Sequence, residues 1–410
     1  MLPDIYFYNP TCELAVANGS ENFMPKDILR RMEYDLDLLP LYFTTPKDIL
    51  LVHKYPDNNF LDSLYNAGFG PFNLQSLEES LKDSYFLSKP KGFLCPWGWS
   101  PSMHKLFSPF KSSCSFEYLN SPVSQWKPIH KELYSRKMGI EVLVKILEDS
   151  DSKYFTPLND LPQICTSHEE IYLLQKEWNH IIVKSPWSSS GRGLQILRPG
   201  EYNRTNHQVI SGFLNHQGYV VVEPFYNKIQ DISFQFYSKG NGQIEFLGIC
   251  SFKTDNSGRY SGSYIEEIPW NSEPSLIDFL EDHLTETKDR IKNALSNSPY
   301  SSQYRGWLGV DAIIYKTSND NFKFQPCIEV NCRFTMGTIV LALRKRLQEG
   351  SKGFFSILYR KEGKLKQFSQ EQKLINPMVI KENKIVKGFT SLTSISEDTV
   401  FGAFLTVDRI

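Results

Sequence analysis

The chain has 410 residues, 40% of them hydrophobic, and its 45 lysine and arginine residues nearly balance 46 acidic residues. This length suits about two to four domains, and this hydrophobic content supports a packed core rather than a disordered chain. The near-zero net charge gives no general attraction for nucleic acid or for an anionic membrane, and no segment approaches the ~20 apolar residues of a membrane helix. We therefore expect neither nucleic acid nor a membrane as a partner.

The seven cysteines are scattered along the sequence and include no C-x-x-C pair. Their odd number and their spacing argue against both a disulfide framework and a zinc site. The amino terminus lacks the basic stretch and long hydrophobic segment of a signal peptide. These features predict a reducing, cytoplasmic location, and the sequence gives no sign of an oligomeric state.

The first part of the chain predicts an α/β lobe. Residues 5–8 and 49–53 have the apolar pattern of buried strands. Helical patterns lie between and after these strands, for example at residues 74–81. The boundary of this lobe is weakest in the Ser/Pro-rich stretch 108–128.

The remainder of the chain is rich in predicted strands. Residues 130–147 and 275–295 have helical patterns, and Ser167 with Glu170 predicts a capping box for a helix that ends near residue 178. The tail from residue 378 to 407 alternates like strands that either complete a large sheet or form a dimer contact. The other predicted strands are residues 164–165, 181–183, 219–222, 232–237, 244–252, 308–315 and 324–330, with a hairpin between the fourth and fifth.

A Ser/Gly-rich loop follows the strand that ends at Lys184. Small residues let backbone N–H groups approach a polyphosphate closely, and serine hydroxyls add hydrogen-bond donors. The loop matches neither a Walker A motif nor a dinucleotide fingerprint. The alternative interpretation is a surface loop with two basic residues. The loop residues considered are Ser188, Ser189, Ser190, Gly191, Arg192 and Gly193.

Two acidic residues near strand ends could contact a nucleoside. The apolar strand 220–222 runs into Glu223 and then Pro224, which takes the chain out of the sheet. Such a strand end can offer backbone groups to the edge of an adenine, and Asp231 at the start of the next strand can accept hydrogen bonds from ribose hydroxyls. Taken singly, each is more often an ordinary polar strand end.

The strongest signal is the strand at residues 324–333. Side chains repeat every two residues, so Glu329, Asn331 and Arg333 share one face. Two oxygen ligands and one cation suit magnesium held between protein and nucleotide phosphates. If the preceding strand pairs with this one, Asp311 lies opposite Glu329, and two carboxylates at that distance favour a cation between them. The alternative is a solvated sheet face with a salt bridge to Arg333.

The order of these segments resembles the ATP-grasp superfamily, which includes D-alanine–D-alanine ligase, biotin carboxylase and purine-pathway ligases. The Glu-x-Asn-x-Arg element is especially similar to that of biotin carboxylase, and the resemblance covers about residues 130–345. It implies an α/β (α+β) ATP-grasp fold preceded by a Rossmann-like α/β domain. The implied parts are an N-terminal domain at 1–125, a small lobe at 126–222 and a large lobe with a β-rich tail at 223–410.

The resemblance also implies roles for individual residues. Lys184 would reach the nucleotide phosphates, and Ser188, Ser189, Ser190, Gly191 and Gly193 would form the loop over them. Glu223 and the backbone at Tyr226 would hold adenine, and Asp231 would hold ribose. The implied magnesium ligands are Asp311, Glu329 and Asn331, and Arg333 would stabilise the acyl-phosphate chemistry.

Other basic positions match the family less specifically. We choose Lys137 as the upstream phosphate contact, with Arg136 as its competitor, and Lys253 and Arg259 as phosphate or substrate contacts. The arginine that some members carry shortly before the first metal ligand is either absent here or supplied by Arg305.

The implied reaction is ATP-dependent activation of a carboxylate as an acyl phosphate, which an amine or another nucleophile then attacks, with release of ADP and phosphate. Two magnesium ions are expected as cofactors with ATP, and manganese could replace them. The expected partners are a small-molecule or peptide carboxylate and an acceptor, and the turn at 9–12 and the loop at 95–101 could line the acceptor pocket or be packed surface corners. The alternatives are an ATP-grasp kinase and a non-catalytic nucleotide-binding protein.

Overall fold

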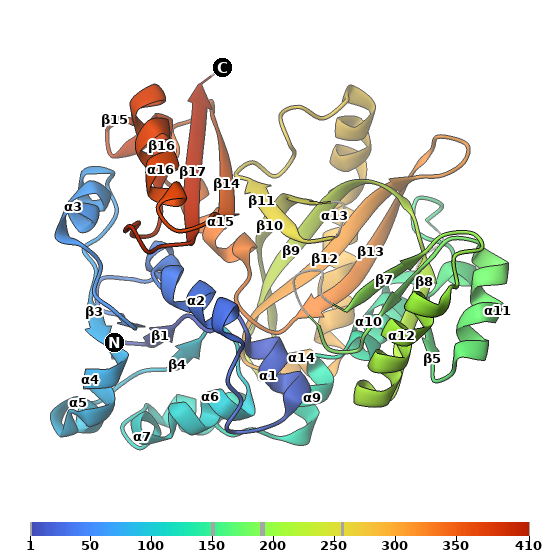
Figure 1. Cartoon of the computed structure of the whole chain (residues 1–410), viewed down its shortest axis with the longest axis horizontal. Coiled ribbons are helices and arrows are strands. Elements are labelled where there is room, and N and C mark those ends of the chain that lie inside the picture. The colour runs from blue at the N-terminus through green and yellow to red at the C-terminus, as the bar shows by residue number, and fades with distance from the viewer. Residues whose placement is uncertain (1, 149–151, 189–192, 256–257, 410) are drawn as a thin grey trace.

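The computed structural model describes residues 2–148, 152–188, 193–255 and 258–409. Three sheets organise the chain (Figure 1). A small parallel sheet lies in the amino-terminal lobe, a small antiparallel sheet lies in the middle of the sequence, and a nine-stranded sheet spans the rest. Among the described residues, no helix is long and apolar enough to cross a membrane.

The first sheet has the strand order β3-β2-β1-β4, and all of its pairs are parallel. Every residue of β2 is buried, as expected for a strand whose sheet is covered on both faces. The strands are β1 (Ile5–Phe7), β2 (Ile49–Val52), β3 (Leu74–Ser76) and β4 (Leu94–Pro96). The helices of this lobe are α1 (Cys12–Asn18), α2 (Asp27–Asp35), α3 (Asn58–Asn66), α4 (Leu77–Lys82), α5 (Ser84–Ser88), α6 (Pro101–Leu106), α7 (Ser108–Lys111) and α8 (Phe116–Leu119), with 3-10 turns at Leu39–Tyr42 and Pro122–Ser124.

The helical prediction for residues 74–81 is wrong at its start. Leu74 and Gln75 pair with β2, and the helix begins only after Ser76. The hydroxyl of Ser76 accepts a hydrogen bond from the backbone N–H of Glu79, which is the usual way for serine to begin a helix. Sequence periodicity did not separate this short strand from the helix that follows it.

The second sheet is antiparallel and has the order β5-β8-β6-β7. Helices α11 and α12 pack against it around buried aliphatic side chains such as Ile171, Val183 and Ile210. The capping box at Ser167 and Glu170 is confirmed. The elements are β5 (Gln163–Cys165), α11 (His168–Trp178), β6 (Ile181–Lys184), β7 (Leu194–Leu197), α12 (Arg204–Gln217) and β8 (Val220–Pro224).

The large sheet has the order β13-β12-β9-β10-β11-β14-β17-β16-β15. The predicted hairpin of β9 and β10 is confirmed, and the tail strands complete this sheet, one of the two roles considered for them. The strands are β9 (Asn227–Ser238), β10 (Ile244–Thr254), β11 (Tyr260–Tyr264), β12 (Gly306–Lys316), β13 (Phe322–Asn331), β14 (Ser351–Tyr359), β15 (Val379–Lys381), β16 (Lys384–Ser391) and β17 (Phe401–Arg409).

Helices cover the large sheet and connect it to the other parts. Helix α10 packs on β13 of the large sheet, although its residues were expected to belong to the small lobe. The approach is close at Gly139, where an added Cβ would lie 3.6 Å from the Cα of Glu329. The tail stands beside the first lobe (Figure 1), where the Tyr42 hydroxyl donates to the Leu392 carbonyl at 2.6 Å. The remaining helices are α9 (Pro128–Leu133), α10 (Arg136–Glu148), α13 (Pro274–Ser296), α14 (Pro299–Ser302), α15 (Met336–Arg344) and α16 (Lys364–Ile375), with a 3-10 turn at Leu158–Asp160.

Candidate active site

The centre of the candidate site is the pairing of β12 with β13. Asp311 and Glu329 are direct partners in the antiparallel register, which confirms the arrangement expected from the sequence. Asn331 lies on the same side, and its Nδ2 donates to Asp311 Oδ2 at 3.0 Å. The sheet therefore brings two carboxylates and one amide together without help from any loop.

The two carboxylates have different electrostatic surroundings. Burial, reinforced by the nearby charge of Glu329, raises the pKa of Asp311 to about 7. Burial acts on Glu329 too, but Arg136, Lys184 and Arg333 outweigh it and hold the pKa of Glu329 below its usual range. Arg136 forms an ion pair with Glu329 at 2.6 Å.

These groups fit a hard divalent cation. Magnesium takes oxygen ligands, and a cation between Asp311 and Glu329 would remove the repulsion that raises the pKa of Asp311. The amide of Asn331 offers a third oxygen. The described residues contain no group of three His, Cys, Asp or Glu side chains that could hold a metal, and the candidate set here is two carboxylates and an amide.

A directional hydrogen-bond chain positions Asp311. The Ser233 hydroxyl donates to Asp311 Oδ1 at 2.6 Å, and Gln235 Nε2 donates to Ser233 Oγ at 2.7 Å. Gln235 Oε1 in turn accepts from the Thr335 hydroxyl at 2.7 Å. Because Gln235 donates to Ser233 Oγ, the Ser233 hydroxyl is directed to donate its own hydrogen bond to Asp311. Sequence reasoning missed these residues because their contacts join three separate elements.

Arg333 connects this cluster to the first lobe. Its Nε lies 3.1 Å from Glu13 Oε1, and its Nη2 donates to Asn331 Oδ1 at 2.8 Å. Gly98 forms an isolated antiparallel bridge with Arg333. Asn9 holds Gly98 in turn, since its Nδ2 donates to the Gly98 carbonyl at 2.8 Å. The turn after β1 and the loop after β4 therefore lie against the arginine, and Glu13 is a site residue that no sequence motif indicated.

The predicted phosphate-binding lysine lies at the end of β6. Lys184 forms a buried ion pair with Glu223 of β8, and both side chains are almost inaccessible to solvent. Burial lowers the pKa of Lys184, although Glu223 opposes this effect. The strand register explains this contact. Glu223 pairs with Ile182, two residues before Lys184 on β6, so the two charged side chains lie on the same face of the sheet as diagonal neighbours.

The loop after Lys184 is described only at its two ends. Ser185 and Ser188 contact Arg136, whose Nε donates to the Ser185 carbonyl at 3.2 Å and whose Nη2 donates to Ser188 Oγ at 3.4 Å. Gly193 has φ of 72°, and a Cβ there would meet Ser185 Oγ at 2.1 Å, so the position requires glycine. The predicted residues Ser189, Ser190 and Gly191, and Arg192 beside them, lie outside the described residues.

The structure brings Arg136, rather than Lys137, into the cluster. Both residues lie in the first turn of α10, but the Lys137 side chain is exposed. Arg136 reaches Glu329 on β13, and it also reaches Ser185 and Ser188 at the start of the predicted phosphate loop. Adjacent helical residues point about 100° apart, so only one of the two can face the sheet.

The residues predicted to hold the nucleoside lie where β8 passes into β9. The Tyr226 ring lies 4.2 Å from the Tyr315 ring, and its hydroxyl donates to the Asp160 carbonyl at 3.3 Å. Asp231 forms an ion pair with Lys228 at 2.7 Å and accepts from the Thr254 hydroxyl at 3.1 Å. Lys228 is thus a further charged residue at this end, and a ribose would have to share Asp231 with it.

Two predicted basic residues lie away from the β12–β13 cluster, as far as their described contacts show. Lys253 is exposed, and its ammonium lies 4.9 Å from the centroid of the Tyr264 ring. Arg259 is also exposed, and its backbone N–H donates to Asp255 at 2.9 Å. The contacts described for them do not reach β13. Arg305 stacks on Phe93 at 4.1 Å instead of joining the metal-ligand cluster.

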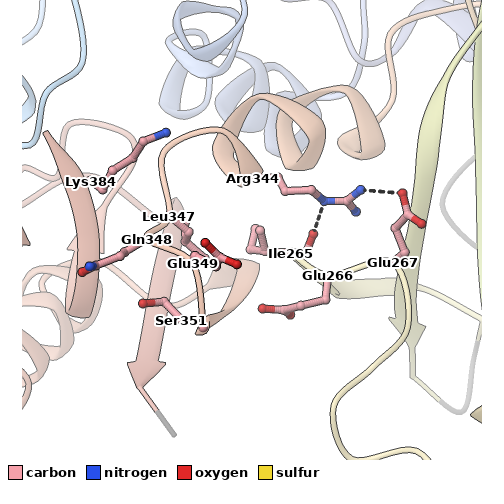
Figure 2. A pocket seen from close by; sticks show the side chains of 10 residues that line it. Ile265, Glu266, Glu267, Arg344, Leu347, Gln348, Glu349, Ser351 and Lys384 are labelled. Atoms are coloured by element: carbon pink, nitrogen blue, oxygen red, sulfur yellow. Dashed lines mark hydrogen bonds and ion pairs between the residues drawn. The ribbon is translucent and has the colours of Figure 1, made fainter. Parts of the chain in front are cut away.

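A hollow on the described surface lies away from these residues (Figure 2). Its volume is about 540 Å³, and it contains none of the predicted site residues. Arg344 is already engaged there, because it forms an ion pair with Glu267 at 3.0 Å and its Nε donates to the Ile265 carbonyl at 2.6 Å. Size alone therefore does not identify the site.

No family model and no curated protein matches the chain. Among solved structures, a biotin carboxylase from Campylobacter jejuni in a complex with β-γ-ATP matches with a TM-score of 0.50 and 12% identity over 100% of this chain and 88% of the other. Pyruvate carboxylase from Rhizobium etli matches with a TM-score of 0.50 and 10% identity over 100% of this chain and 36% of the other. N5-carboxyaminoimidazole synthetase from Staphylococcus aureus complexed with ADP matches with a TM-score of 0.48 and 12% identity, covering 100% and 94% of the two chains. At these identities the similarity establishes the fold alone.

Proposed function

Because this chain has the ATP-grasp fold, we propose that it is an ATP- and magnesium-dependent ligase that activates a carboxylate as an acyl phosphate. An amine or another nucleophile would then attack this intermediate, and ADP and phosphate would be released. The observation that carries the proposal is the pairing of Asp311 with Glu329 beside Asn331, flanked by the cations Arg136 and Arg333. We also propose that the protein is cytoplasmic and that its substrates are small molecules.

The charges of the cluster suit a polyphosphate with its metal. Asp311, Glu329 and Asn331 would hold the magnesium, which when bound supplies neutralisation of phosphate charge. Arg136 contacts both the phosphate loop and Glu329, so it can bind a phosphate that lies between them. Lys184 would bind a second phosphate oxygen from the end of β6. These groups position and neutralise the reactants, which is the main protein contribution to phosphoryl transfer.

Arg333 would bind the activated carboxylate. Its guanidinium is planar and offers a fork of donors that matches a carboxylate or a phosphoryl group. In the structure, Glu13 and Asn331 interact with these donors. The carboxylate of Glu13 thus stands in for the anion that Arg333 would hold during the reaction, and substrate binding would exchange one for the other.

Nucleotide binding with and without magnesium tests the proposal. We expect ADP and a non-hydrolysable ATP analogue to raise the melting temperature of the wild-type chain more strongly when magnesium is present. Glu329→Gln/Asn331→Ala should lose the magnesium-dependent part. Arg136→Met should weaken nucleotide binding, and the matched variant Lys137→Met on the same helical turn should not.

Phosphate release then identifies the reaction. A ligase releases ADP and free phosphate when a carboxylate and an acceptor are both supplied, whereas a kinase keeps the phosphate on its product. A wild-type chain that binds no nucleotide under any condition would refute the proposal. Binding without turnover on any carboxylate and acceptor pair would favour a non-catalytic nucleotide-binding protein.

A further inference from the structure

A second cavity lies between the first lobe and the large sheet. Its volume is about 420 Å³, within the usual range for small-molecule sites. Tyr6 of β1 and Phe93, which directly precedes β4, lie on one side of it, and Trp307 of β12 lies on the other. Neither Asp311 nor Glu329 lines this cavity, so it is separate from the candidate active site.

Aromatic rings form much of the cavity wall. The Trp307 ring lies 5.5 Å from Phe334 and 6.3 Å from Tyr237, and Tyr6 lies 6.1 Å from Phe334. Trp307, Tyr237 and Tyr6 are partly buried and line the cavity. These rings already pack against one another, and a ring that lines the cavity can take a further planar group on its cavity side by offset stacking or edge-to-face contact.

Arg305 supplies a cation to this aromatic cavity. Its guanidinium carbon lies 4.1 Å from the centroid of Phe93. Its buried Nε–H has no hydrogen-bond acceptor within the part of the chain that the structure describes, although the guanidinium interacts with the Tyr237 hydroxyl. A buried donor without an acceptor is unfavourable, and an arginine fork matches a carboxylate.

The other charges of the cavity do not neutralise Arg305 by direct contact. Asp4 lines the cavity, but its Oδ1 accepts a hydrogen bond at 2.7 Å from the backbone N–H of Phe93. Lys47 and Glu117 also line it, and both are exposed. A ligand that stacks on the rings and places an acidic group at Arg305 would match both features of the cavity.

We propose that this cavity binds a small aromatic carboxylate, whose ring lies among Trp307, Tyr6 and Phe334 and whose carboxylate pairs with Arg305. The inference does not depend on the nucleotide site and can be tested in the absence of ATP and magnesium.

Titration calorimetry with four probes tests the proposal in the full chain. Indole-3-acetate and L-tryptophan both carry a ring and a carboxylate, indole has the ring alone, and acetate has the carboxylate alone. We expect saturable binding of indole-3-acetate or L-tryptophan that is at least tenfold tighter than binding of indole or acetate. Which of the two binds tighter shows whether Asp4 also recognises an ammonium group.

Two arginine variants separate the site from general effects. Arg305→Met keeps the apolar stem of the side chain and should weaken probe binding at least tenfold. Arg346→Met is the matched control, because Arg346 also stacks on an aromatic ring, Phe69 at 5.5 Å, but does not line the cavity. The control should bind the probes like the wild type.

Trp307→Leu provides an independent check if Arg305→Met fails to fold. It should lose the preference for aromatic probes while its melting temperature shows a folded chain. The proposal is overturned if the wild type binds neither aromatic carboxylate, or if folded Arg305→Met or Trp307→Leu binds them as tightly as the wild type does.

Discussion

Two buried regions of this molecule differ in the charge that lies beside their ionisable side chains. In the candidate site, each buried cation has a carboxylate beside it, as Lys184 has Glu223 and Arg333 has Glu13. In the first lobe, His104 is also buried, but the charged group beside it is Lys111, with Nζ 2.9 Å from Nδ1. Burial and Lys111 lower the pKa of His104 to about 3, so this region is stable with a neutral imidazole.

The comparison shows that burial alone does not decide the charge of a group. The opposite charge that the fold places beside it decides whether the group stays ionised. A region that keeps charges in pairs is ready to exchange one partner for a charged ligand. In the first lobe, His104 is neutral, and its protonation would destabilise the folded chain.

Breaking the buried pair at the end of β6 should have the largest effect. Lys184→Met leaves Glu223 buried without a cation, so we expect a loss of about 3–5 kcal/mol in the free energy of unfolding. Urea denaturation at pH 7 measures it. Lys239→Met is the control, because it removes a largely exposed pair with Glu245 and should cost no more than about 1 kcal/mol. Equal losses in the two variants would contradict the comparison.

Removing the donor to Asp311 should have an intermediate effect. Ser233→Ala leaves the carboxylate in place but unpositioned, and we expect about 10–100-fold weaker magnesium binding in the presence of ADP. Nucleotide binding without metal should not change. Ser238→Ala is the matched control, since Ser238 is a buried serine of the same strand that donates to the Tyr300 carbonyl at 2.9 Å. A magnesium affinity that falls equally in both variants would leave no special role for Ser233.

The neutral histidine predicts a dependence of stability on pH. The pKa of His104 is about 3 in the folded chain, below its value of about 6.5 when unfolded. Its contribution is therefore fully present above pH ~6.5 and is lost as the pH falls, at about 1.4 kcal/mol per pH unit. Unfolding of the wild type and of His104→Gln between pH 7 and pH 4 measures the difference. Parallel pH curves would show that His104 can be protonated in the folded state.

The smallest effect is expected where charges are not buried at all. Lys253 and Arg259 are exposed on or near β10, so Lys253→Met/Arg259→Met should change the free energy of unfolding by no more than about 1 kcal/mol. Thermal and urea unfolding check this outcome. A larger loss in the free energy of unfolding would mean that these two side chains contribute to the packed core.

The sequence predicted the parts of the site that lie on registered strands. The two-residue repeat of β13 placed Glu329 and Asn331 together, and strand pairing placed Asp311 opposite Glu329. It was harder to predict which side chain of α10 faces the sheet, because Arg136 and Lys137 are neighbours in sequence and differ only in the direction of their side chains. Glu13 and Gln235 were missed, since their contacts depend on how distant elements pack, and no local pattern encodes that.

The ion pair between Arg333 and Glu13 also has a consequence for the order of events during synthesis. The two residues are separated by 320 positions, and translation proceeds at about 5–20 residues per second. Glu13 therefore leaves the ribosome roughly 16–64 s before Arg333 does. During this interval Glu13 has no Arg333 to pair with, so the ion pair can form only after at least 333 of the 410 residues have been made.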